Sequence, residues 1–276
     1  MRCPFLQETQ LRFCRISAGP KMIARAGGSG FEEKCSSSSY ATCAVYRQRP
    51  GDVTEPVCPH LETSPAQYCS AAAGTRPIPQ TPLRSSCESG CYRYCRVYRG
   101  TLESTDEEPT VVEGIHVPAD RRYATSHLWL DLAEDGWCHA GIDGFLARML
   151  GRVEQVTAVA SRGTMRPAAV LRAHALDWRV AFPNPIPEAA GNPHLRAHPE
   201  SLTTDPYGGG WLFAGRLDTS NRAAEAGLIA GERAMEWMTH EIERISRLLG
   251  GRAFQEGLLG RLDRDEALSL FQDFCQ

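Results

Sequence analysis

The sequence contains very little lysine and no long hydrophobic run. Its only lysines are Lys21 and Lys34, so no chemistry that needs a lysine amine is available beyond residue 34. No stretch of eighteen apolar residues occurs, and this predicts that the chain has no membrane span. The segment Met1 to Phe5 lacks the basic and apolar regions of a signal peptide. We therefore expect a cytoplasmic protein.

The sequence also lacks the motifs of an independent enzyme. It shows no nucleophile–base pair, no paired carboxylates, no phosphate-binding loop and no metal-hydrolase motif, so we expect no independent catalytic activity. The chain is long enough for two small domains. We predict four parts: a duplicated cysteine-rich module over residues 1–99, an acidic linker over 100–113, a β-rich domain over 114–217 and a helical C-terminal arm over 218–276.

Cysteine, in contrast, is abundant, and most of it belongs to an internal repeat. Residues 3–47 form one copy and residues 58–99 a second, with Cys3-Pro4 recurring 55 positions later as Cys58-Pro59. The cysteines are spaced C-x10-C-x20-C-x7-C and C-x10-C-x17-C-x7-C. They are Cys3, Cys14, Cys35 and Cys43 in the first copy, and Cys58, Cys69, Cys87 and Cys95 in the second. Because each copy retains four thiols, we predict that the four act together.

Four thiolates in so short a unit indicate a metal centre, because a copy this small cannot bury enough apolar surface by itself. The long spacings contain no C-x2-C zinc-binding hairpin, and they favour two [4Fe-4S] clusters. Two zinc ions, disulfides and buried thiols without metal remain alternatives. Of the other three cysteines, Cys91 is expected to be a spare thiol outside the metal sites, and Cys138 and Cys275 are expected to be buried free thiols.

The charge distribution bears on the partners. Residues 1–99 carry 13 Lys/Arg against 7 Asp/Glu, whereas the remainder of the chain is acidic. A basic module could suit nucleic acid, but two thiolate-bound metal centres would remove most of its positive charge, and its arginines are dispersed. We therefore expect no nucleic-acid binding, and protein partners in a multisubunit complex.

Three blocks of the second half have a recognisable order and spacing. His127-Leu128-Trp129 lies in a strand-like stretch, Gly141 to Gly151 predicts a turn and a short helix, and Asp205-Pro206-Tyr207-Gly208-Gly209-Gly210-Trp211-Leu212 predicts a turn before a final strand starting at Trp211. Together they resemble the glycine cleavage H-protein family over about residues 114–217. The resemblance implies an α+β protein, in which a lipoyl-type flattened β-barrel (a barrel-sandwich hybrid) is flanked by the cysteine module and C-terminal helices.

The same resemblance places the family's lipoyl lysine at Ala175. No amine is present there, so the resemblance implies a domain without lipoate. Its neighbour His174 is expected to be a solvated hairpin histidine. Three prolines within Asp177–Pro187 predict a re-shaped loop in place of an extended strand.

The C-terminal arm has the pattern of two helices. An apolar stripe follows helical spacing, ends at Gly250-Gly251, and comprises Met235, Met238, Ile242, Ile245 and Leu249. Asp263 is positioned to cap a second helix. We expect the stripe to pack against the neighbouring domain, with an external partner or a second subunit as the alternative.

Together these features predict a non-lipoylated, H-protein-like subunit that carries two four-cysteine metal centres. Its expected role is that of an electron-transfer or docking subunit in a larger redox complex. Two alternatives remain at this point: a zinc-stapled adaptor or regulator that docks on the H-protein's partner enzymes, and a divergent glycine-cleavage carrier.

Overall fold

The computed structural model describes residues 2–16, 21–23, 34–50, 56–71, 76–78, 86–88, 90–101, 110–134, 136–159, 166–187, 189–217 and 225–275. The chain forms two compact units, an N-terminal unit of Pro4–Ser85 and a main unit of Met1–Cys3 with Ser86–Gln276. The boundary between them falls inside the second repeat copy. Most of the expected linker, residues 102–109, lies outside the described residues.

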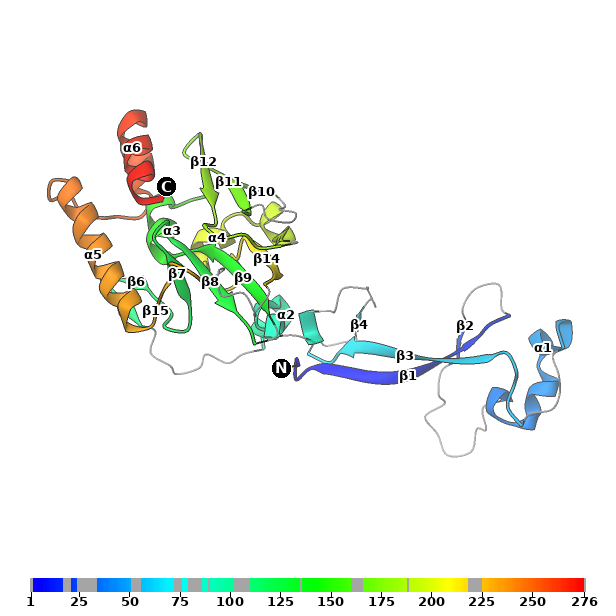
Figure 1. The fold of residues 1–276 in the computed structure, drawn as a ribbon. Helices are drawn as coiled ribbons and strands as arrows, with labels where there is room; N and C mark the ends of the chain where they lie inside the picture. Colours follow the sequence, from blue (N-terminus) through cyan, green and yellow to red (C-terminus); the bar gives the residue numbers. More distant parts are fainter. Residues whose placement is uncertain are drawn as a thin grey trace. The chain divides into compact units, whose positions relative to one another are not determined.

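The N-terminal unit is built on an antiparallel four-stranded sheet of order β2-β1-β3-β4. The strands are β1 (Leu6–Cys14), β2 (Lys21–Ile23), β3 (Leu61–Cys69) and β4 (Arg76–Ile78), and η1 (Lys34–Ser36), η2 (Ser38–Thr42) and α1 (Ala44–Gln48) lie between β2 and β3 in the chain (Figure 1). The central strands come from the two repeat copies and run antiparallel, with Leu6 opposite Cys69 and Cys14 opposite Leu61. The duplication therefore produces a two-fold arrangement of equivalent strands.

The main unit contains further antiparallel sheets. The largest has the order β13-β14-β9-β8-β7-β15, and a three-stranded sheet has the order β10-β11-β12. The strands are β5 (Val111–Val112), β6 (Ile115–His116), β7 (Arg122–Ala124), β8 (Leu128–Leu132), β9 (Trp137–Ile142), β10 (Gln155–Val159), β11 (Ala168–Ala173), β12 (Leu176–Ala181), β13 (Ala190–Gly191), β14 (Phe213–Arg216) and β15 (Ile229–Ala230).

Helical segments precede, interrupt and follow these strands. They are η3 (Ser86–Glu88), η4 (Gly90–Tyr94), α2 (Arg96–Arg99), α3 (Gly144–Leu150), η5 (Pro193–Arg196), α4 (Ser201–Thr204), α5 (Glu232–Leu248), η7 (Leu258–Arg261) and α6 (Arg264–Cys275). Figure 1 shows α5 (orange) and α6 (red) together on one side of the main unit. The mixture of helix and antiparallel sheet confirms the α+β class. Among the described residues, no helix combines the length and apolar character that a membrane crossing requires.

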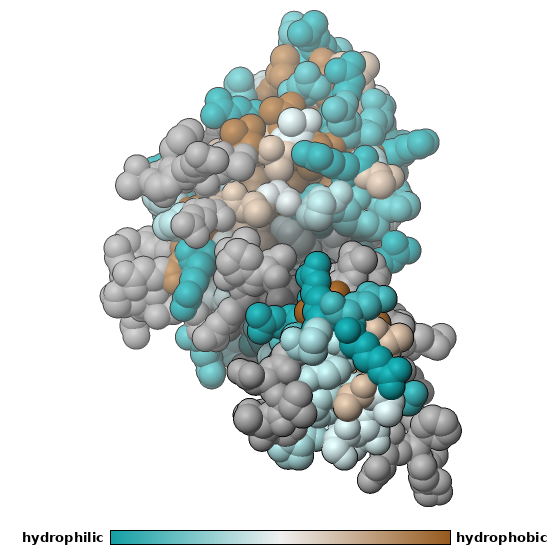
Figure 2. All heavy atoms as spheres, turned by 90° about the vertical axis from the view of Figure 1, so that its right-hand side faces the viewer, coloured by the Kyte–Doolittle hydropathy of each residue, from teal (hydrophilic) through white to brown (hydrophobic). Residues whose placement is uncertain are grey.

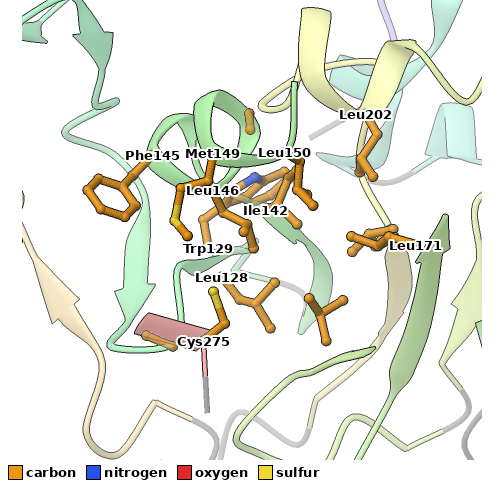
Figure 3. Packing of buried hydrophobic residues seen from close by; sticks show 14 of the residues in the cluster. Leu128, Trp129, Ile142, Phe145, Leu146, Met149, Leu150, Leu171, Leu202 and Cys275 are labelled. Carbon is orange, nitrogen blue, oxygen red and sulfur yellow. The ribbon is translucent and has the colours of Figure 1, made fainter. Parts of the chain in front are cut away.

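The core of the main unit is organised around α3. Asp143 caps this helix by accepting a 2.9 Å hydrogen bond from Leu146 N, and Gly151, with φ of +63°, ends it. In Figure 3 Leu146 and Met149 of α3 lie near Trp129 of β8, and Phe145 belongs to the same buried cluster. The short helix predicted between Gly141 and Gly151 is confirmed.

The C-terminal stripe belongs to the same core. Met238, Ile242 and Ile245 of α5 are buried with Phe271 and Phe274 of α6 in the cluster that includes residues of the sheets. Within the described part of the chain, the exposed large apolar side chains are Val111, Val159 and Leu248. In Figure 2 the hydrophobic residues visible on one face occur as small groups among hydrophilic ones. The expectation that the stripe packs on its own chain is confirmed, and Asp263 Oδ1 caps α6 as predicted.

Two details of the predicted strands were wrong. The segment beginning at Asp177 is not a loop, because β12 extends to Ala181 and the prolines follow the strand instead of interrupting it. Since β12 is an edge strand, its end can turn away without breaking a central ladder. The final strand begins at Phe213 rather than Trp211, and Trp211 is only half-buried.

Candidate functional site

The turn between β11 and β12 lies where the resemblance places the carrier lysine. Ala173 pairs with Leu176, so His174 and Ala175 form a two-residue hairpin loop. Both have left-handed backbone conformations, with φ of +54° and +60°. These are the signs that a type I′ hairpin turn requires. Ala175 therefore stands at an exposed tip, where its side chain offers only a methyl group.

The C-terminal arm packs beside this tip. His174 Nε2 lies 2.8 Å from the carbonyl oxygen of Leu150 at the end of α3. A side chain added to Gly260 would overlap the His174 ring, and a Cβ at Gly151 would lie 2.6 Å from Gly257 Cα. A shallow pocket of about 370 Å³ here is lined by Gly151, Arg152, His174, Glu256, Gly257, Gly260 and Arg261. The imidazole is thus held by the chain's own backbone, although the residue remains exposed as expected.

A cluster of ionisable side chains fastens the arm to the core. His127 and Asp143 are completely buried, and His127 Nδ1 lies 2.8 Å from Asp143 Oδ2. His127 Nε2 faces Glu241 Oε2 of α5 at 3.7 Å. The imidazole stacks on Phe145, with ring centroids 4.1 Å apart, and on Trp237 of α5, with centroids 4.9 Å apart. We call His127, Asp143 and Glu241 the arm clamp.

Within the arm clamp, the negative carboxylates favour the protonated form of His127, and protonated His127 favours the ionised form of Glu241. Burial alone lowers the pKa of His127, but the charge and hydrogen bond of Asp143, together with the charge of Glu241, outweigh it, and the pKa is raised above its usual value. Burial tends to raise the pKa of Glu241, but His127 and Arg244 outweigh that effect and lower it. His127 and Asp143 are inaccessible to solvent, and the pairing of His127 with Glu241 joins α5 to the start of α3.

The end of the second repeat copy also packs on the main sheet. The Tyr94 ring stacks on His139, with centroids 3.9 Å apart, and its hydroxyl donates a 2.6 Å hydrogen bond to Asp131 Oδ2. Arg99 forms an ion pair with Asp205, in which Arg99 Nη2 lies 3.0 Å from Oδ1. Burial lowers the pKa of His139 to about 4, so the ring is neutral near pH 7. Residues 90–99 are therefore part of the main unit rather than separated from it by a linker.

Four of the repeat cysteines gather at one end of the N-terminal sheet. Cys14 ends β1 opposite Leu61, and Leu61 N donates a 3.0 Å hydrogen bond to Cys58 O. Cys58 N donates to Cys35 O at 2.9 Å. Cys35 and Cys43 pack against the small buried cluster that contains Cys58. Three of these cysteines belong to the first repeat copy and one to the second.

The remaining repeat cysteines are divided between the units. In the main unit, Cys3 N donates a 2.8 Å hydrogen bond to Cys87 O, Cys91 is buried and Cys95 precedes α2. In the N-terminal unit, Cys69 ends β3. No group of three or more His, Cys, Asp or Glu side chains within the described ranges has the arrangement of a metal site. The structure therefore gathers cysteines without showing a formed coordination sphere.

The two cysteines outside the repeat are buried, as predicted. The Cys138 thiol donates to Gly215 O at 3.5 Å, and burial raises its pKa to about 12. Burial also raises the pKa of Cys275, and the charges of Asp143 and Glu241 act in the same direction. Both thiols are therefore protonated near pH 7, which is unfavourable for metal ligation.

The comparisons with known proteins match part of this chain to H proteins. The glycine cleavage system H protein of Neisseria meningitidis serogroup C is 32% identical over 121 residues, covering 43% of this chain and 93% of that protein. The chain belongs to the glycine cleavage system H protein family. The H protein of Aeromonas hydrophila is 30% identical over 112 residues, covering 40% of this chain and 87% of that protein. That of Chromobacterium violaceum is 32% identical over 117 residues, covering 41% and 90%.

A solved H-protein structure is also similar to part of this chain. A crystal structure of an H protein from Mycobacterium marinum is 21% identical, covers 45% of this chain and 99% of its own, and has a TM-score of 0.35. No family model matches the chain. The similarity to H proteins covers under half of this chain.

Sequence reasoning missed the arm clamp of this H-protein family member. The sequence places His127 in a strand-like motif, and no pattern in it singled out Glu241. A weak signal was present, because Glu241 directly precedes Ile242, which faces the core. A charged residue beside a buried stripe could have been examined for a buried partner.

Proposed function

We propose that this chain is a non-lipoylated H-protein-like subunit that works by docking in a larger redox complex. In this proposal its main unit is a lipoyl-type flattened barrel formed by the six-stranded and three-stranded sheets. The relatives are named as components of a glycine cleavage system, and this supports association with other proteins. The protein surface, rather than a swinging arm, would then carry its function.

The observation that carries the proposal is the composition of the β11–β12 tip. The methyl group of Ala175 cannot form an amide with lipoate, and the lysines of the chain lie outside the H-like region. The neighbouring His174 is held by Leu150 O and packed against the arm. A tip built in this way supports a fixed contact surface and not a carrier.

The cysteine repeat supplies the second part of the proposal. We assign the two metal centres to Cys3, Cys14, Cys35, Cys43, Cys58, Cys69, Cys87 and Cys95. The absence of a zinc hairpin motif favours two [4Fe-4S] clusters, which would give the subunit an electron-transfer role. Two zinc ions would instead make it a colourless adaptor or regulator, since zinc has no redox chemistry.

The first experiment tests lipoylation directly. The full chain and its Ala175→Lys variant are each co-expressed with a lipoate ligase in lipoate-containing medium, and their intact masses are measured. The unmodified sequence should gain no lipoyl group, whereas the variant restores an exposed amine at the tip and should gain one. A lipoyl-sized increment on the unmodified chain would overturn the non-carrier proposal, and a modified variant shows that the ligase recognises this domain.

The second experiment concerns the metal. The full chain is purified without oxygen, and iron, zinc and acid-labile sulfide are measured together with the visible spectrum. Iron, sulfide and a brown colour support electron transfer, whereas stoichiometric zinc in a colourless protein supports the adaptor. Protein that contains neither metal contradicts the metal-centre part of the proposal and leaves the docking part to be judged by co-purification of partners.

A further inference from the structure

Two cysteines of the second repeat copy are too far apart to share one metal. In the second copy, Cys58 and Cys69 stand at opposite ends of β3, which runs extended over nine residues from Leu61 to Cys69. Eight steps of about 3.3 Å place the ends of the strand roughly 26 Å apart. The three residues from Cys58 to Leu61 could bring Cys58 back towards Cys69 by at most about 11 Å. Thiolates that bind one zinc, at about 2.3 Å each, need Cα atoms within on the order of 10 Å.

The antiparallel pairing brings cysteines of different copies together instead. Cys14 is opposite Leu61, and Leu61 closes a turn with Cys58, so Cys14 and Cys58 lie at the same end of the sheet. Cys58 also binds Cys35 through their backbones at 2.9 Å. Cys43 packs on the same buried cluster. Thus Cys58 stands with three cysteines of the first copy.

The main unit shows the reciprocal half of this arrangement. Cys3 corresponds in the repeat to Cys58, and Cys87 corresponds to Cys35. The hydrogen bond from Cys3 N to Cys87 O, at 2.8 Å, reproduces the bond between Cys58 and Cys35.

The aromatic neighbours of these cysteines repeat as well. Tyr40 and Tyr46 meet edge to face with ring centroids 5.0 Å apart, and their counterparts Tyr92 and Tyr98 meet at 4.8 Å. The same local structure therefore forms twice, and each time the first cysteine is supplied by the other copy.

We propose that Cys14, Cys35, Cys43 and Cys58 form one tetrathiolate metal site, completed by exchange of the first cysteine between the repeat copies. By the same exchange, Cys3 belongs with Cys87. This grouping replaces the copy-by-copy grouping expected from the sequence, and its metal rests on the proposed function. Binding a metal releases the thiol protons and draws the gathered side chains into a coordination sphere, so its free energy contributes to folding.

Double variants of the full chain distinguish the two groupings. If Cys35 and Cys58 share a site, the double variant Cys35→Ser/Cys58→Ser should lose one of the two metal centres. Each of the two single variants should lose the same one centre. Cys58→Ser with Cys87→Ser should then lose both, because it damages two sites. The copy-by-copy grouping requires the opposite result, with the first pair losing both centres and the second pair losing one. Metal per chain is measured after anaerobic purification, and the reversed pattern would refute the exchange.

A chemical measurement tests the grouping independently of bound metal. The full chain is treated with chelator and reductant, cross-linked with dibromobimane, a short bifunctional thiol reagent, and mapped by mass spectrometry after digestion. Cross-links should join members of the set Cys14, Cys35, Cys43 and Cys58. Predominant linkage of Cys58 to Cys69 or Cys87 would overturn the exchange. Cross-links within the set in a chain that never binds metal would leave the grouping supported and refute the metal-centre proposal alone.

Discussion

Replacing Glu241 by Gln should weaken the attachment of the C-terminal arm in a pH-dependent way. Glu241 Oε2 lies 3.7 Å from His127 Nε2, and the glutamate side chain is 13% exposed. At an effective dielectric constant of about 20, this separation corresponds to roughly 4.5 kcal/mol of Coulomb attraction before desolvation is subtracted. Asp143 still pairs with His127 after the change. We therefore expect a net loss of about 2 kcal/mol, because part of this attraction offsets the desolvation of the two side chains.

The pH dependence of this stability loss follows from the pKa shifts of His127 and Glu241. The raised pKa of His127 means that its stabilising contribution is complete below about pH 6.5 and is lost as pH rises through the folded-state value. The lowered pKa of Glu241 means that its contribution is complete above about pH 4.5 and is lost as pH falls. The cost of Glu241→Gln should therefore be greatest near pH 5.5 to 6.5 and should decrease in alkaline solution.

The assay is urea unfolding of the full chain at about pH 6 and pH 9, followed by tryptophan fluorescence, because Trp237 of α5 stacks on His127. Glu243→Gln is the matched control, since Glu243 lies on the same helix and is exposed. The control should cost far less than Glu241→Gln at either pH. An equal cost for both variants, or a Glu241→Gln cost that does not change with pH, would refute the arm clamp.

Three further substitutions test the H-like domain and its contact with the C-terminal arm. Trp211→Ala should lower the free energy of unfolding by about 2 kcal/mol, because the half-buried indole packs edge to face on His139. Ala175→Lys at the exposed tip should change it by less than about 0.5 kcal/mol. Equal losses for the two variants in thermal or urea unfolding would contradict the placement of Trp211 against the core and of Ala175 at the tip. Gly151→Ala should lower the free energy of unfolding by roughly 2 to 3 kcal/mol, because Gly151 has a positive φ and its added Cβ would lie 2.6 Å from Gly257 Cα. An unchanged urea midpoint would show that the arm does not pack against Gly151.

Local chemistry was readable from the sequence because it depends on neighbouring residues. Gly151 ends α3, Gly250 follows α5 and Asp263 caps α6, because caps and positive φ angles are properties of short segments. The spacing of the family blocks was sufficient to predict the H-like region. The absence of lysine near Ala175 excludes amide attachment of lipoate without any structural information.

Contacts between distant segments were decided only by the tertiary structure. The repeat suggested that each copy gathers its own four cysteines, but an extended strand separates its ends, and antiparallel pairing of the copies brings Cys58 to Cys14 and Cys35 instead. Likewise, no local pattern connects His127 with Glu241, since packing of α5 against the core is what places their charges together. Sequence periodicity specifies which face of an element is apolar, whereas the partner of that face depends on how the whole chain packs.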